Sequence, residues 1–97
     1  MRFEWDEAKR RANLRKHGFD FADVEEMFLG TLLVEPDLRD ECGEARWAGL
    51  GLISGCAAKV VFVERGPDVV RIISLRKATS RERKEFEEAI DDRLEAD

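Results

Sequence analysis

The stretch from Val69 to Lys84 constrains the fold of this chain more than any other part of the sequence. Residues 69–77 are rich in branched apolar side chains, which favours a β-strand. Thr79 and Glu82 then form the Thr-x-x-Glu pattern of a capping box, which starts a helix. We therefore expect a strand that runs almost directly into a helix.

Positive charge is concentrated at this junction. Within residues 71–84, Glu82 is the one acid, and it stands among six cations. The cations are Arg71, Arg76, Lys77, Arg81, Arg83 and Lys84. Guanidinium and ammonium groups pair with phosphate oxygens through charge-assisted hydrogen bonds. The segment therefore predicts an anionic partner, of which phosphate is the commonest.

Strand alternation predicts where the arginines of this segment point. Successive residues of a strand face opposite sides of a sheet, so we expect Arg71 and Arg76 to lie on opposite faces. Arg76 stands just before the capping box and can lean toward the N-terminus of the following helix, whose free N–H groups also bind anions. This predicts a phosphate site at Arg76; the alternative is a structural salt bridge to one of the many acids.

The N-terminal third of the sequence is typical of two helices. Asp6 is a good N-cap and Gly18 a good C-terminal stop for the first helix. Asp20 can cap a second, shorter helix that ends at Gly30, and the apolar residues between them have helical spacing.

Three more apolar segments follow, at residues 31–35, 46–53 and 59–65. Glycine or proline separates them, and the short connections favour an antiparallel meander with strand 69–77. The predicted order is α-α-β-β-β-β-α, an α+β fold with helices packed on a four-stranded antiparallel sheet. We expect one domain over residues 1–97, because a chain of this length has no room for a second core.

Charge is distributed in blocks along the sequence. The net charge is −5, but residues 1–18, 19–46, 47–84 and 85–97 carry +3, −7, +5 and −6. Two basic segments can therefore form one basic patch on an acidic protein, as a nucleic-acid-binding protein needs. The alternative is an ordinary mixed surface of solvated charges.

The sequence favours a cytoplasmic protein without a metal or cofactor. No run approaches the roughly 18 apolar residues of a membrane span, and acids interrupt the first six residues, unlike a signal peptide. Cys42 and Cys56 match no metal-ligand spacing, so we expect free thiols.

Two gapped motifs at opposite ends of the chain resemble the BrnT family. The first, over residues 3–18, is Phe-Glu-Trp-Asp-x-x-Lys-x-x-x-Asn-x-x-Lys-His-Gly. The second, over residues 71–83, is Arg-Ile-Ile-Ser-Leu-Arg-Lys-Ala-Thr-x-x-Glu-Arg, and the Val-Val-Phe-Val-Glu-Arg segment at 60–65 is also similar. The resemblance implies a RelE-like fold and an mRNA-cleaving toxin of a type II toxin-antitoxin system. It also implies a cognate BrnA-like, DNA-binding antitoxin that forms a hetero-oligomer with the toxin and inhibits it.

The chain departs from the family pattern at its aromatic residues. Phe62 and Phe86 stand where many relatives have tyrosine, Leu75 stands where a small alanine is usual, and the sequence contains no tyrosine. A phenol therefore cannot serve as a base or a stacking donor in this chain.

The implied reaction, metal-free cleavage of RNA, makes three demands on the protein. A base must take the 2′-hydroxyl proton, cations must stabilise the crowded phosphorane, and an acid must protonate the leaving 5′-oxygen. Arg76 is our candidate for stabilising the transition state, with Lys77 as a second cation.

Two residues are candidates for proton transfer. His17 is the one histidine of the chain, and histidine is the residue type that exchanges protons near neutral pH. The alternative is a helix-end residue that satisfies backbone carbonyls. Glu64 is a candidate base if it lies near the cations; the alternative is a surface ion pair with Arg65 or Lys59.

Further residues are candidates for binding RNA: Arg71, Lys9, Lys16, Asn13 and Arg81. Lys9 and Lys16 widen the basic face that follows an RNA backbone, and Asn13 can orient a base or cap the first helix from within. The alternative function is a non-catalytic RNA- or protein-binding module that uses the same basic face.

Overall fold

The four predicted strands are all present and form an antiparallel meander. The structure, a computed structural model, describes residues 1–37 and 45–95. In chain order the strands are β2 (Leu33–Pro36), β3 (Trp47–Ile53), β4 (Cys56–Glu64) and β5 (Val69–Lys77). Ser54 and Gly55, which join β3 to β4, both have positive φ angles, as tight hairpin turns require.

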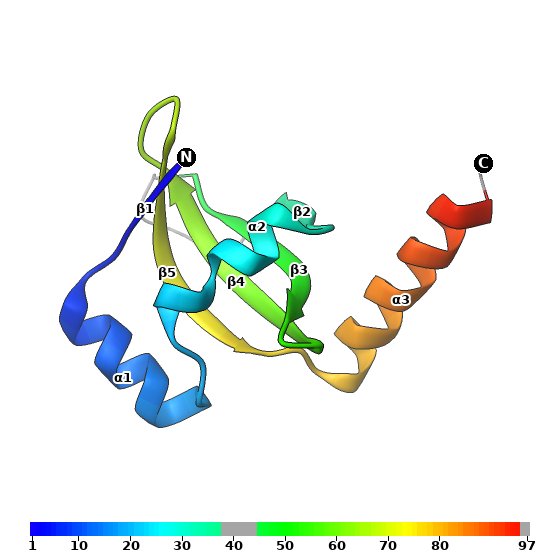
Figure 1. Cartoon of the computed structure of the whole chain (residues 1–97), viewed down its shortest axis with the longest axis horizontal. Coiled ribbons are helices and arrows are strands. Elements are labelled where there is room, and N and C mark those ends of the chain that lie inside the picture. Colours follow the sequence, from blue (N-terminus) through cyan, green and yellow to red (C-terminus); the bar gives the residue numbers. More distant parts are fainter. Residues whose placement is uncertain (38–44, 96–97) are drawn as a thin grey trace.

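The prediction of a four-stranded, purely antiparallel sheet was wrong. A short strand at the N-terminus, β1 (Arg2–Glu4), pairs in parallel with the first three residues of β5. The sheet is therefore five-stranded and mixed, with the order β1-β5-β4-β3-β2 (Figure 1). Three residues are too few to show a strand alternation, so only the long-range pairing with β5 identifies β1 as a strand.

The first predicted helix is confirmed, with both of its ends. α1 (Glu7–His17) begins where the Asp6 carboxylate accepts a hydrogen bond from the Lys9 backbone N–H at 3.1 Å. It ends at Gly18, whose φ of 75° is the left-handed conformation that glycine adopts most easily.

The second predicted helix is divided in two. Asp20 caps a 3₁₀ turn, η1 (Phe21–Asp23), which leads into a short helix, α2 (Glu25–Leu29). Phe21, Val24 and Met27 are 0 to 1% exposed and are spaced three residues apart. The 3₁₀ turn η1 has three residues per turn, and residues three apart also share a face in the α-helix that follows, so all three side chains point toward the sheet.

The hydrophobic core lies between η1–α2 and one face of the sheet (Figure 1). The buried sheet residues of this core are Ile53, Ala58, Val60, Phe62, Val70, Ile72 and Leu75. Gly49 and Gly51 of β3 lie where a Cβ atom would come within 2.9 to 3.2 Å of Leu32. Their missing side chains let Leu32 approach the sheet closely.

A β-bulge in β5 changes which residues share a face. The pairs Phe62–Ile72 and Val61–Ser74 leave Ile73 as an extra residue on β5. The expectation that Arg71 and Arg76 lie on opposite faces was therefore wrong, because the extra residue shifts the alternation by one. Both arginines lie on the face opposite the core.

The last helix, α3 (Ser80–Glu95), follows β5 after two residues, as the capping box predicted. It extends away from the far end of the sheet (Figure 1) and is anchored by Phe86, which is 4% exposed. Among the described residues, no helix is both long enough and apolar enough to cross a membrane.

Candidate active site

Asn13 brings the two basic segments of the chain together. β1 pairs only with residues 69–71 of β5, so Leu75 has no strand neighbour on that edge. Asn13 Nδ2 donates to the Leu75 carbonyl at 2.7 Å, and the Leu75 N–H donates to Asn13 Oδ1 at 3.1 Å. The amide therefore forms the two hydrogen bonds that a neighbouring strand would form.

Asn13 is consequently unavailable to RNA. The residue is 8% exposed, and Nδ2 also donates to the Phe19 carbonyl at 3.1 Å, which uses its second N–H. Neither of our two expectations, an RNA contact or a cap within the first helix, describes this role. Asn13 instead attaches α1 to the sheet.

The attachment places His17 near the end of β5. α1 and β5 run side by side in the same direction (Figure 1). His17 follows Asn13 by four residues, so it lies on the same face of α1, one turn closer to the end of β5 that carries Arg76 and Lys77. His17 is half-buried, whereas Lys77 is exposed and forms no ion pair with the part of the chain that the structure describes.

Arg76 lies in a cluster with one acid and a second cation. Its Nη1 and Nη2 donate to the two carboxylate oxygens of Glu82 at 2.8 and 3.0 Å. Lys59, the cross-strand partner of Arg76 on β4, places its Nζ 3.4 Å from Glu82 Oε2. Arg76 therefore forms the salt bridge that was the structural alternative, and its side chain nevertheless remains 30% exposed.

Glu82 also caps α3. The Thr79 N–H donates to Glu82 Oε1 at 2.9 Å, and the Glu82 N–H donates to Thr79 Oγ at 3.1 Å, which confirms the capping box. The Arg76 guanidinium, followed by the Thr79 N–H and the charge of Lys59, lowers the pKa of Glu82 to about 2, although partial burial opposes this shift. The carboxylate is thus ionised at neutral pH.

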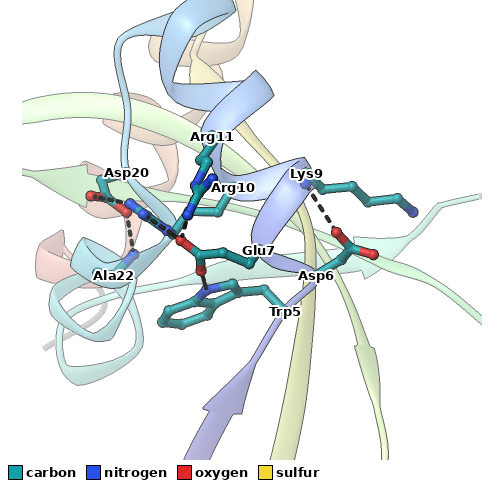
Figure 2. Close-up of polar contacts among 8 residues, drawn as sticks. All are labelled: Trp5, Asp6, Glu7, Lys9, Arg10, Arg11, Asp20 and Ala22. Atoms are coloured by element: carbon teal, nitrogen blue, oxygen red, sulfur yellow. Dashed lines mark hydrogen bonds and ion pairs between the residues drawn. The ribbon is translucent and has the colours of Figure 1, made fainter.

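A second cluster holds the start of α1 against η1 (Figure 2). Arg10 donates through Nε to Glu7 at 2.7 Å and through Nη1 to Asp20 at 3.0 Å. The Arg10 hydrogen bond lowers the pKa of Glu7, and Glu7 also accepts a hydrogen bond from Trp5 Nε1 at 3.3 Å. Lys9 is exposed, and its side chain points away from this cluster in Figure 2. It forms no ion pair in the described part of the chain.

Two of the predicted site residues lie at the opposite end of the sheet. Arg71 pairs with Glu4 of β1 at 2.8 Å. Glu64 is exposed at the end of β4, five residues beyond Lys59, which corresponds to roughly 17 Å along a strand. Glu64 and Arg76 are therefore too far apart to act on one phosphodiester, and the condition that we attached to Glu64 as a base is not met.

The other predicted cations are exposed. Lys16 lies in the last turn of α1 near His17. Arg81 lies in the first turn of α3, with its side chain 91% exposed and a loose 3.8 Å contact to Glu85. Lys59 and Glu82 were missed as site residues. The position of Lys59 beside Arg76 depends on strand register, and Glu82 was interpreted as a helix cap alone.

The sequence matches a family described as the ribonuclease toxin BrnT of type II toxin-antitoxin systems, over residues 5–82. This match spans most of the chain and includes Asn13, His17, Arg76 and Glu82. The chain belongs to the BrnT family of ribonuclease toxins. Most of α3, which continues to Glu95, lies beyond the matched residues.

A solved structure supports the membership. The 1.1 Å crystal structure of the Brucella abortus ribonuclease toxin BrnT is 36% identical in sequence to this BrnT-family chain and matches it with a TM-score of 0.69. The match covers 82% of this chain and 99% of the Brucella chain. No curated protein matches the sequence.

Proposed function

We propose that this BrnT-family toxin is an endoribonuclease that cleaves mRNA without a metal ion and is inhibited by a cognate, BrnA-like antitoxin. One observation carries the proposal: Asn13 holds α1 on β5 at Leu75, and the last turn of α1, which ends at His17, follows this contact toward the strand end that carries Arg76 and Lys77. This supports the proposal, because a residue type that transfers protons then lies toward the same end of the sheet as cations that can pair with phosphate.

In the proposed reaction the 2′-oxygen of RNA attacks the adjacent phosphorus. The new bond between the 2′-oxygen and phosphorus forms as the bond to the 5′-oxygen breaks, which leaves a 2′,3′-cyclic phosphate and a 5′-hydroxyl end. Arg76 stabilises the negative charge of the phosphorane, and Lys77, the last residue of β5, adds positive charge at the same strand end. His17 accepts the 2′-hydroxyl proton or donates a proton to the leaving 5′-oxygen, and solvent water exchanges the other proton.

RNA approaches this site along basic side chains. Lys16 and Lys9 extend the positive surface along α1, and Arg81 extends it onto α3, all of them exposed. Each cation that contacts a phosphate releases a counterion from the RNA, so the binding is sensitive to salt. The antitoxin blocks the reaction by covering these cations.

An end-mapped cleavage assay tests the proposal. The purified chain is incubated with a long single-stranded RNA in the presence of a chelator, beside Arg76→Ala, His17→Ala and the matched control Arg93→Ala, an exposed residue of α3. We expect 2′,3′-cyclic phosphate ends from the parent chain and from Arg93→Ala. Arg76→Ala should lose cleavage by at least about 100-fold, the scale of one electrostatic contact to the transition state.

Two results would contradict the proposal. Cleavage that the chelator abolishes would show that a metal ion is required. RNA that stays intact with every protein, also after ribosomes are added, would favour the non-catalytic binding module.

A further inference from the structure

The guanidinium of Arg76 offers two edges that match the oxygens of a phosphate or carboxylate. An arginine has five N–H donors in a rigid fork, and either the Nη1–Nη2 edge or the Nε–Nη2 edge can hold two oxygens at once. Glu82 occupies the Nη1–Nη2 edge of Arg76, and Nη1 also donates to the Lys77 carbonyl at 3.0 Å. Nε and the second N–H of Nη2 donate to no residue that the structure describes.

The occupied edge is held rigidly. Glu82 is bound from three elements at once: Arg76 on β5, Lys59 on β4, and Thr79 at the start of α3. Its side chain is 19% exposed, so these contacts are partly shielded from water. An arginine that is bound to such a fixed carboxylate keeps one orientation, and its other edge points in one direction.

The charge of the cluster suits an anionic ligand. Glu82 carries one negative charge, and Arg76 and Lys59 carry two positive charges. Lys59 lies 3.4 Å from Glu82, so it offsets the repulsion that the carboxylate would otherwise exert on an incoming phosphate. The cluster therefore keeps a net positive charge although Arg76 is already paired.

We propose that Glu82 is a positioning residue, which presents the free Nε–Nη2 edge of Arg76 to the reacting phosphate of RNA. The inference rests on the proposed function, because it requires Arg76 to bind that phosphate. Lys59 completes the arrangement by balancing the Glu82 charge. The Arg76 side chain is 30% exposed, so it remains accessible to a ligand.

Glu82 has a second role that the test must separate. The capping box needs an oxygen that accepts from the Thr79 N–H, and glutamine supplies this oxygen as well as glutamate does. Holding both Nη atoms of Arg76 needs two acceptor oxygens, and the amide of glutamine has only one. Glu82→Gln therefore preserves the cap and disturbs the orientation of Arg76.

Thr79→Ala is the matched control, because it removes the hydroxyl that accepts the Glu82 N–H and leaves the Glu82 carboxylate on Arg76. The variants are compared by steady-state cleavage of a short fluorogenic RNA with chelator, and by melting temperature. We expect Glu82→Gln to lower kcat by about 10- to 100-fold, the cost of a misplaced catalytic group, with KM changed by less than about threefold. We expect Thr79→Ala to lower the melting temperature and to retain kcat.

A double-mutant cycle checks that Glu82 acts through Arg76. Lysine has no planar fork to orient, so Glu82→Gln should lower kcat far less in an Arg76→Lys background than in the parent chain.

The Lys59→Met variant tests the charge of the cluster and leaves the cap intact. It should raise KM severalfold at low salt with little change in kcat, since the cluster then loses its net positive charge.

Different results would overturn the positioning role of Glu82 and the proposed ribonuclease function. Cleavage that is lost in Arg76→Ala but unchanged in Glu82→Gln would overturn the positioning role and leave the ribonuclease intact. Equal losses of kcat in Glu82→Gln and Thr79→Ala would show that Glu82 acts only as a helix cap. Cleavage unchanged in Arg76→Ala would overturn both proposals.

Discussion

At the scale of single residues, Asn13 has the largest structural consequence. It connects α1 to β5 across 62 positions of sequence and satisfies both backbone groups of Leu75 at an edge that no strand covers. Buried N–H and C=O groups that lose their partners are costly, so one side chain maintains both the junction and the location of His17.

Asn13→Ala should destabilise the chain by roughly 2–4 kcal/mol, because it leaves the N–H and C=O groups of Leu75 without partners in a buried site. Urea unfolding followed by circular dichroism measures this difference. The exposed substitution Lys9→Ala on the same helix is the control and should stay within about 0.5 kcal/mol of the parent chain. An Asn13→Ala chain as stable as the control would show that water replaces the amide at this edge.

The two phenylalanines that we compared with tyrosines of the family pattern are packing residues in this chain. Phe62 and Phe86 are 5% and 4% exposed. The ring of Phe62 lies edge-on to Phe28, with centroids 5.1 Å apart. Neither ring is placed to touch RNA, so the proposed chemistry depends on His17 and the cations.

At the scale of secondary structure, the residues that begin α3 also belong to the proposed site. The capping box starts the helix, and its glutamate also binds two strands of the sheet. The same carboxylate therefore joins α3 to the sheet and holds Arg76, the residue that we propose binds the phosphate of RNA. Because the pKa of Glu82 is lower in the folded chain than its ordinary value of 4.5, the junction is sensitive to acid.

Ionised Glu82 stabilises the fold above about pH 4.5, and this contribution is lost as the pH falls through about 2. The melting temperature of Glu82→Gln should therefore lie below that of the parent chain near neutral pH, and the difference should shrink as the pH approaches 2. Thermal melts across this range measure it. Thr79→Ala keeps every titrating group of the parent chain, so its difference in melting temperature from the parent should vary much less with pH. A Glu82→Gln difference that is constant with pH would contradict the lowered pKa.

At the scale of the whole molecule, the proposed site is basic on an acidic chain because positive and negative charges are concentrated in different segments. α1 carries five cations and one acid, and Asn13 places its basic end beside the basic end of β5. The net charge of −5 resides largely in other segments of the chain. A partner that covers the site is therefore attracted to one region of the surface rather than to the chain as a whole.

The proposed antitoxin should stabilise the toxin through mass action. A ligand that binds only the folded chain adds about 2.7 kcal/mol at a concentration 100 times its Kd, which corresponds to a rise in melting temperature on the order of 10 °C for a domain of this size. Differential scanning fluorimetry with the purified cognate antitoxin measures the rise, with serum albumin as the control. An equal melting temperature with and without the antitoxin would contradict inhibition through a stable complex.

Much of the secondary structure follows from the sequence by itself. Asp6 and Gly18 delimit α1, and Thr79 with Glu82 starts α3, because a cap needs only groups within a few residues of one another. The strand segments follow from local composition and from the glycines and prolines between them. His17 and Arg76 stand out as candidates for the same reason: their chemistry is a property of the residue type.

The tertiary structure alone decided how these parts meet. The pairing of β1 with β5, the contact of Asn13 with Leu75, and the position of Lys59 beside Arg76 all join residues that are distant in sequence. One extra residue at Ile73 moved Arg76 to the face that it shares with Lys59 and Arg71. A shift of one residue in register reverses the face of every side chain beyond it, and only the packed sheet sets that register.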